Sequence, residues 1–285
     1  MSDAATDAGR VREETLAPGV LRWTLDSPRK RNALSPAMLA WLQRRAAELR
    51  GEVVLLAGAG EAFCAGFDLD ALPTPPPVPE DMSRAPASPV PEDMSRAPAS
   101  PVLEDSTPDA PLIAATTALR RADATLVAVL HGAVFGAGVE LACCCDLRLA
   151  RTDTRFTVPV ARLGVVYHPA GVDLLHHTVG LALAQRLLLL GDTVGADELL
   201  RAGAVHGVHP AADLDAAALA LAGRLRSGAP GPLRAHRDRL RALAAGTAPD
   251  DRAHEAARRT AYHGEDYREG RAAARERRPP RFTGG

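Results

Sequence analysis

The chain has 285 residues, 46% of them hydrophobic, and its 34 basic residues nearly balance 35 acidic ones to give a formal net charge of −1. A chain of this length and composition can bury a large core, so it is typical of a globular protein with one large domain, or one domain and an appendage. The near-neutral balance excludes a globally basic nucleic-acid-binding protein. It also excludes a chain that is acidic and disordered throughout.

Three elements are predicted before the first long break in the hydrophobic pattern. Residues Gly19–Asp26 have the pattern of a strand, and Glu52–Ala57 form a short apolar run typical of a buried strand. Between them, Pro36–Arg50 has the periodicity of an amphipathic helix, with Ser35 as its N-cap and Pro36 at the first helical position. This order predicts a strand–helix–strand unit.

A proline-rich segment follows, and it holds 12 of the 23 prolines between Pro73 and Pro111. The sequence VPEDMSRAPASP runs from Val78 to Pro89 and is repeated from Val90 to Pro101. The segment has almost no large apolar residues, so it cannot build a core, and two short copies are too few for a solenoid. We therefore expect residues 73–111 to be a disordered surface insertion.

Strands and helices alternate again after this insertion. Helices are predicted at Leu112–Ala122 and Ala137–Cys145, and apolar strands at Thr125–Leu130 and Leu147–Ala150. Such alternation is typical of an α/β protein in which parallel strands are covered by helices.

The pattern changes near Ala170, after which helices dominate. Helical segments are expected near residues 172–178, 181–190, 195–202, 213–227, 231–245 and 251–277. We therefore predict two parts: a sheet-based core over residues 10–170 that contains the insertion, and a helical region over residues 171–285.

The sequence has no feature of an exported or membrane-spanning protein. Its first residues, MSDAATDAGRVREE, include acids and no apolar stretch, and the longest apolar runs are too short to cross a bilayer. The four cysteines, Cys64 and the consecutive Cys143–Cys145, have the spacing of neither a disulfide framework nor a metal site. We expect a cytoplasmic protein that has buried thiols and binds no metal, membrane or nucleic acid.

Two glycine-rich turns, Gly58–Leu69 and Gly132–Glu140, each follow a predicted buried strand. Glycine allows close backbone approach and positive φ, and N–H groups at the start of a helix are oriented donors. Two such turns from neighbouring strands could direct two N–H groups at one oxygen, which is the arrangement of an oxyanion hole. Glycine-rich turns are also common between strands and helices, so spacing alone leaves both readings open. A dinucleotide site is less favoured because the first turn lacks G-x-G-x-x-G directly before a helix, and no lysine follows a glycine pair as in a phosphate-binding loop.

Four motifs in order resemble the crotonase, or enoyl-CoA hydratase/isomerase, superfamily over nearly the whole chain. They are SPRKRNALS at 27–35, AFCAGFDL at 62–69, the element Gly132–Asp146, and the closing pair GEDYREG at 264–270 and ERRPPRFTG at 276–284. The resemblance implies an α/β fold built as a spiral of ββα turns. It also implies a helical C-terminal region that mediates trimerisation, hence a homotrimer or a dimer of trimers.

The resemblance also assigns positions for a thioester substrate. The oxyanion-hole donors would be the backbone N–H groups of Phe67 and Ala137. No permanently bound cofactor is implied, since coenzyme A enters as part of an acyl-CoA substrate. Its nucleotide and diphosphate would lie against Lys30, Arg31, Ala33, Ala65, Gly66, Asp68, Leu69 and Asp70.

Acid–base groups decide which reaction follows. Glu140 matches the first of the two glutamates that hydratases of the family use, and a carboxyl group in so apolar a stretch suits a proton shuttle; the alternative is a structural carboxylate. The second glutamate is replaced by Val160. Tyr167 and His168 fall in a loop that the resemblance places beside the acyl pocket, where His168 could act as acid or base or could simply bind loop carbonyls. Arg162 is more readily explained as support for the fold than as a ligand for a substrate carboxylate.

The expected function is therefore that of an acyl-CoA-transforming enzyme in which a backbone oxyanion hole stabilises a thioester enolate and Glu140 moves the proton. With one glutamate, double-bond isomerisation or a related proton transfer is favoured over simple hydration. The alternatives are an acyl-CoA decarboxylase or thioesterase on the same fold, and a non-catalytic acyl-CoA-binding or scaffold protein. In the tail, Ala274 stands where the family often has phenylalanine, while Arg277 and Arg278 could meet CoA phosphates or form a solvated basic end.

Overall fold

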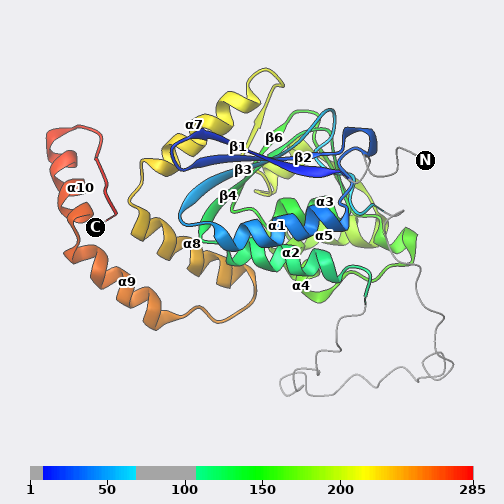
Figure 1. The fold of residues 1–285 in the computed structure, drawn as a ribbon. Coiled ribbons are helices and arrows are strands. Elements are labelled where there is room, and N and C mark those ends of the chain that lie inside the picture. Colours follow the sequence, from blue (N-terminus) through cyan, green and yellow to red (C-terminus); the bar gives the residue numbers. More distant parts are fainter. Residues whose placement is uncertain (1–8, 69–106, 285) are drawn as a thin grey trace, which may run out of the picture.

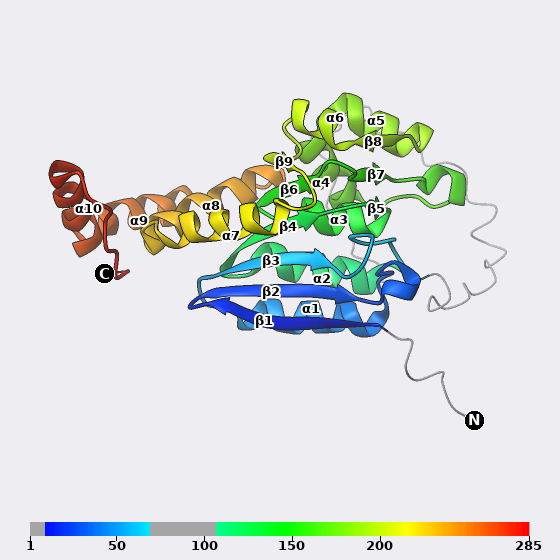
Figure 2. The ribbon, with the colours of Figure 1, turned by 90° about the horizontal axis from the view of Figure 1, so that it is seen from above.

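The structure is a computed structural model, and it describes residues 9–68 and 107–284. A central sheet carries helices on both faces, and a helical arm extends from it at the C-terminal end of the chain (Figures 1 and 2). The repeats at residues 78–101 and the predicted CoA-binding residues Leu69 and Asp70 lie outside the described residues.

The main sheet has six strands in the order β1-β2-β3-β4-β6-β9. β1 is antiparallel to β2, and every other neighbouring pair is parallel. The central strands β3 and β4 are mostly apolar because helices cover both faces of the sheet. The strands are β1 Arg10–Ala17, β2 Val20–Asp26, β3 Glu52–Gly58, β4 Ala124–Leu130, β6 Leu147–Arg151 and β9 Gly207–His209.

A second, smaller sheet begins just beyond the carboxyl end of β4. It consists of β5 Ala133–Phe135, β7 Arg155–Thr157 and β8 Thr193–Gly195, in that order. β5 is parallel to β7, and β7 is antiparallel to β8. Each of its strands has three residues.

Alternate residues of the central strands face two different helical layers. Val54 and Leu56 of β3 belong to the large core cluster with α1, α2 and α3, whereas Val53 and Leu55 belong to the smaller cluster with α7. Figure 1 shows α7 on one face of the sheet and α1, α2 and α4 on the other. These helices are α1 Pro36–Glu48, α2 Ala110–Arg121, α3 Ala137–Cys143, α4 Pro169–Val179 and α7 Leu214–Arg226.

The start of α1 illustrates how sequence sets these boundaries. The Ser35 side chain accepts a hydrogen bond from the Met38 N–H, and Pro36 occupies the first turn, where its missing N–H costs nothing. Pro111 plays the same role in the first turn of α2, which begins at Ala110. The helix that we expected to begin at Leu112 therefore begins two residues earlier, within the end of the expected insertion. The α/β fold with alternating strands and helices is confirmed.

The arm is made of α8 Pro230–Ala244, α9 Asp251–His263 and α10 Glu265–Glu276. It projects from the end of the sheet where β3 and β4 begin (Figure 2). Arg241 of α8 anchors it: Nε and Nη2 each donate to the Asp146 carboxylate at 2.6 Å, and the guanidinium also donates to the carbonyls of Ala122 and Ala124 at 2.8 Å. The predicted helix at 251–277 is two helices, because the chain turns at Gly264.

Of the strands in the described residues, the sequence analysis missed five: β1, β5, β7, β8 and β9. β9 completes the main sheet, so the sheet extends past the boundary expected at residue 170, and β8 lies in the same predicted helical region. Both have three residues, too few to show a period-two pattern. β1 was missed because RVREETLA is polar, and only Val11 in it is buried. It is an edge strand most of whose side chains are exposed to solvent.

The remaining elements connect these layers. They are the 3₁₀ helices η1 Pro28–Lys30 and η5 Val160–Leu163, the α-helices α5 Leu181–Gln185 and α6 Ala196–Arg201, and the π-helix η6 Arg186–Leu190. No helix in the described part of the chain is long and apolar enough to cross a membrane.

Candidate functional site

The two glycine-rich turns lie side by side. Cys64 and Val134 form a parallel bridge, in which the Phe135 N–H donates to the Cys64 carbonyl at 2.9 Å. The segments run in the same direction, so three residues further on Phe67 and Ala137 occupy matching positions. The two turns, which the sequence analysis identified separately, are thus joined by backbone hydrogen bonds.

Glycine is required in the first turn by both space and backbone conformation. Gly66 has φ +91°, and a Cβ atom there would lie 2.9 Å from the Phe135 carbonyl oxygen and 3.5 Å from the Ala137 nitrogen. Gly136, just before Ala137, has φ +52°. Both conformations favour glycine strongly. Each glycine therefore turns the chain immediately before one of the two expected donors.

The N–H groups of Phe67 and Ala137 donate to no acceptor among the described residues. Leu34 pairs with Phe67 through the carbonyl of Gly66 and the N–H of Asp68, a parallel pattern that leaves the N–H of Phe67 directed away from Leu34. Ala137 is the first residue of α3, so its N–H has no partner within the helix and carries the partial positive charge of the helix start. Both N–H groups thus remain without an acceptor within the described chain.

Glu140 lies one turn further along α3 and is 3% exposed. Its Oε1 atom is 2.9 Å from Nε2 of His168, and its Oε2 atom makes no hydrogen bond within the described chain. Residues three apart share one side of a helix, so the Glu140 side chain lies on the same face of α3 as the Ala137 side chain. A buried carboxyl group with one free oxygen is suited to exchanging a proton with a bound molecule.

His168 forms the N-cap of α4, since its Nδ1 atom accepts a hydrogen bond from the Gly171 N–H at 3.2 Å. An accepting Nδ1 carries no proton, so the ring proton is on Nε2, which donates it to Glu140. His168 therefore reaches the site as a neutral imidazole in one tautomer. The loop histidine of the sequence analysis is a partner of the glutamate.

Tyr167 completes this group, with its ring centroid 5.6 Å from that of His168. Burial, followed by the negative charge of Glu140, raises the pKa of the Tyr167 hydroxyl well above its ordinary value. The phenol therefore stays protonated next to the carboxyl group. The structure thus brings together Glu140, Tyr167 and His168, which the sequence analysis proposed as acid–base candidates.

Val160 stands where the second glutamate was expected. It begins η5 and packs against the large hydrophobic core cluster. Arg162 in the same turn donates to the Leu190 carbonyl at 2.8 Å and so ties η5 to the end of η6. This contact supports the structural explanation of Arg162.

The described residues among those expected to bind CoA lie on two segments that contact each other. The Ala65 N–H donates to the Arg31 carbonyl at 2.9 Å, and Nζ of Lys30 is 2.9 Å from the Asp68 carboxylate. Lys30 remains 29% exposed, whereas the Asp68 side chain is 9% exposed. Lys30 is therefore paired with an acid that is itself buried, and Ala33 on the same segment is buried too.

Asn32 is a site residue to which the sequence analysis assigned no role. It is fully buried, accepts from the Ser27 N–H at 2.9 Å, and donates to the carbonyls of Ala59 and Ala62 at 2.8 and 2.7 Å. Its φ of +59° is one that asparagine tolerates better than most residues. Asn32 thus joins the turn that carries Lys30 to the turn that ends at Phe67. In the sequence, the indication that Asn32 has a role was its place in the SPRKRNALS motif.

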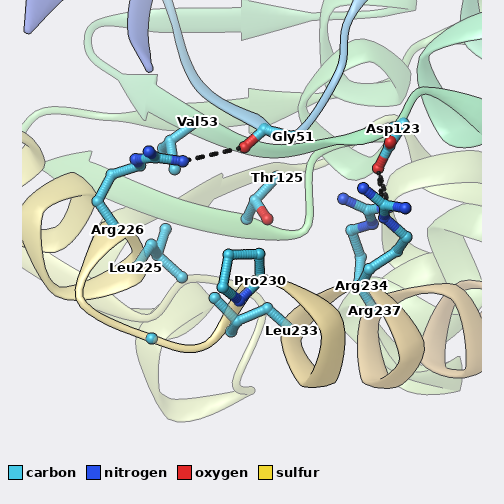
Figure 3. Close-up of a pocket in the computed structure, with 11 residues that line it drawn as sticks. Gly51, Val53, Asp123, Thr125, Leu225, Arg226, Pro230, Leu233, Arg234 and Arg237 are labelled. Atoms are coloured by element: carbon cyan, nitrogen blue, oxygen red, sulfur yellow. Dashed lines mark hydrogen bonds and ion pairs between the residues drawn. The ribbon is translucent and has the colours of Figure 1, made fainter. Parts of the chain in front are cut away.

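Two features elsewhere are separate from this site. Arg278 is paired within the arm, with Nη2 2.9 Å from the Glu269 carboxylate, and this contact lowers the pKa of Glu269 to about 2. A small cavity at the amino ends of β3 and β4, opposite the glycine-rich turns, is bordered by Asp123 and by Arg226, Arg234 and Arg237 (Figure 3). Within the described residues no group of histidine, cysteine and acidic side chains is placed to hold a metal ion.

Comparison with known proteins identifies the family. Residues 92–285 match the family described as enoyl-CoA hydratase/isomerase. The chain is 29% identical over 274 residues to 2,3-dehydroadipyl-CoA hydratase of Escherichia coli (strain K12), which covers 93% of this chain and 95% of that protein. It is also 27% identical over 264 residues to methylmalonyl-CoA decarboxylase of the same organism, covering 90% of this chain and 91% of the other.

A solved structure agrees with these relatives. The crystal structure of a putative enoyl-CoA hydratase from Streptomyces coelicolor A3(2) is similar with a TM-score of 0.76 at 30% identity, covering 100% of this chain and 98% of that one. The resemblance drawn from the sequence motifs is confirmed, and so is the crotonase fold. The chain belongs to the enoyl-CoA hydratase/isomerase family of the crotonase superfamily.

Proposed function

We propose that this enzyme moves a proton on an acyl-CoA thioester, and that the reaction is a double-bond isomerisation or a closely related proton transfer. The observation that carries the proposal is the Glu140 carboxyl group, which is buried, held at Oε1 by His168 and unpaired at Oε2. It lies one helical turn from the unpaired N–H of Ala137.

In this mechanism the thioester carbonyl oxygen accepts hydrogen bonds from Phe67 and Ala137. Oε2 of Glu140 removes a proton from Cα, and the electron pair of the C–H bond moves into the carbonyl, so that negative charge develops on the oxygen. The two N–H groups and the start of α3 stabilise that charge. His168 meanwhile stabilises the orientation of Glu140 by donating to Oε1.

Isomerisation then needs no second acid. In a 3-enoyl thioester, loss of the Cα proton gives a dienolate, and the newly protonated Glu140 returns the proton to Cγ while the double bond moves to Cα–Cβ. Hydration would instead require one group to activate water and another to protonate Cα. Val160 can do neither, which supports proton transfer over hydration.

A decarboxylase is the second candidate. When a malonyl-type thioester loses CO₂, the electron pair of the broken C–C bond forms the enolate directly, so the oxyanion donors suffice and no base is needed. The apolar Val160 side chain and the decarboxylase relative support this alternative. A thioesterase and a non-catalytic acyl-CoA-binding protein remain open alternatives.

The arm supports a proposal about assembly. None of the residues of α8 and α9 is buried, and Leu240, Leu243, Tyr262 and Tyr267 are exposed large side chains on the arm. The arm lies at the end of the sheet opposite the candidate site (Figure 2), so it covers no part of its own site. We propose that it packs on other copies in a homotrimer or dimer of trimers, which sedimentation equilibrium would test.

The expected cytoplasmic location stays a prediction.

Incubation of the purified protein with acyl-CoA thioesters in D₂O tests the reaction. A 3-enoyl thioester should acquire deuterium and become the 2-enoyl isomer, as followed by mass and by absorbance of the conjugated product. Release of CO₂ from a malonyl-type thioester would favour the decarboxylase. Binding without exchange or product would favour the scaffold protein.

A further inference from the structure

Gly171, in the first turn of α4, is a glycine that the backbone does not require. It is buried, and it is not among the glycines with positive φ. Glycine weakens a helix relative to alanine at such a position. The reason for glycine at this position must therefore lie in the space around it and not in its backbone conformation.

The space that a side chain would take is filled by the acid–base group. A Cβ atom on Gly171 would lie 2.8 Å from Nε2 of His168 and 2.9 Å from Cε1 of Tyr167, both too close for carbon contacts. Nε2 is the atom that binds Glu140. An alanine would therefore press directly on the ring nitrogen that makes this contact.

The helix cannot withdraw to relieve this pressure. Leu174 and Leu175 of α4 are 5% and 2% exposed and belong to the core cluster that also includes residues of α3. Since packed cores resist displacement, the ring would have to move instead of the helix.

The N–H of Gly171 adds a second constraint. It donates to Nδ1 of His168 at 3.2 Å and to the His168 carbonyl at 3.0 Å. The bond to Nδ1 is what leaves the ring proton on Nε2. Ring position and ring tautomer thus depend on the same residue.

We propose that Gly171 is a positioning residue, which holds the imidazole of His168 in the place and tautomer that orient Glu140. This inference rests on the proposed function, because it takes Glu140 as the group that moves the substrate proton.

The first test compares two glycine-to-alanine substitutions. In Gly171→Ala, kcat for proton exchange is expected to fall about tenfold to a hundredfold while KM changes less than about twofold. Gly223→Ala is the matched control, since Gly223 lies within α7 and a Cβ atom there meets nothing within 4 Å. The control should retain full activity. Unchanged kcat in Gly171→Ala would overturn the proposal.

A double substitution separates positioning from general damage. If Gly171 acts through His168, then Gly171→Ala should cause no further loss of kcat in a His168→Asn background. Asparagine can still cap α4 but is too short to contact Glu140 in the same way. If the two substitutions instead reduce kcat by independent factors that multiply in the double variant, Gly171 supports the fold independently of His168. That result would overturn the proposal.

A third test uses NMR spectroscopy and does not depend on activity. In ¹⁵N-histidine-labelled protein, the signals missing from His168→Asn identify His168. They should report protonation at Nε2 alone in the wild type and a mixture of tautomers in Gly171→Ala. An unaltered tautomer in Gly171→Ala would overturn the inference even if the enzyme were inactive on every thioester. A wild type without exchange activity but with the expected tautomer shift would instead count only against the proposed function.

Discussion

The Nε2–H group of His168 donates to Oε1 of Glu140 across 2.9 Å and so joins α4 to α3, although the two residues are 28 positions apart. The other ring nitrogen accepts the Gly171 N–H, which places the ring proton on Nε2. A glutamate restrained in this way presents one particular oxygen, Oε2, to a substrate.

Replacing Glu140 by glutamine should abolish most proton transfer. The amide oxygen can still accept from His168, so the fold is expected to be retained, but the side chain can no longer take up a proton. A loss of about 100-fold to 10,000-fold in kcat is expected, with KM nearly constant. Deuterium exchange at Cα measures it. Glu48→Gln, at an exposed position on α1, is the control. Full activity in Glu140→Gln would move the chemistry to Tyr167 or His168.

Two substitutions of His168 separate its capping role from its contact with Glu140. His168→Ala removes both and should destabilise the protein by about 1 kcal/mol through the lost cap. His168→Asn retains a capping side chain and should be closer to wild type in urea denaturation. Both should lose at least about tenfold in kcat, because neither donates to Glu140 as the imidazole does. If asparagine restored activity together with stability, His168 would be a cap alone.

The oxyanion hole can be tested by removing one donor without changing the start of the helix. Ala137→Pro deletes the N–H at the first position of α3, where proline is well accepted. Ala137→Gly keeps the N–H and is the matched control. The proline variant should lose about 100-fold to 1,000-fold in kcat, as expected for one missing oxyanion donor. Equal activity in the two variants would contradict the assignment.

The parts of this site differ in how far sequence could predict them. Gly66 and Gly136 are visible because strained turns need glycine, and the apolar runs of β3 and β4 show which strands lead into them. The contact between Glu140 and His168 depends instead on how α4 returns over α3, which no local pattern encodes. At Val160 the sequence shows that the second acid is missing. It does not show that a neutral histidine lies beside the remaining acid, Glu140.

Asn32→Ala should destabilise the protein more than any surface substitution. It would leave the Ser27 N–H and the carbonyls of Ala59 and Ala62 without partners in a fully buried position. Each unpaired buried group costs about 1–3 kcal/mol, so a total of several kcal/mol is expected in urea denaturation. Because Asn32 supports the segment of Lys30, KM for an acyl-CoA should also rise. A loss below about 1 kcal/mol would contradict this reading.

Stability should fall as the solution becomes acidic, in part through His206. Burial, and then the charge of Arg148, lower the pKa of His206, whose Nδ1 accepts the Arg148 N–H at 3.1 Å. The unfolded chain therefore binds this proton first as pH falls through about 6.5, and the folded state loses stability from there down to its own lower pKa. Urea denaturation at about pH 7.5 and about pH 5 measures the loss. His206→Asn should reduce it without abolishing it, because burial also lowers the pKa of His131. His176→Asn, at an exposed position on α4, should leave it unchanged, and an equal loss in both variants would exclude His206 as a source.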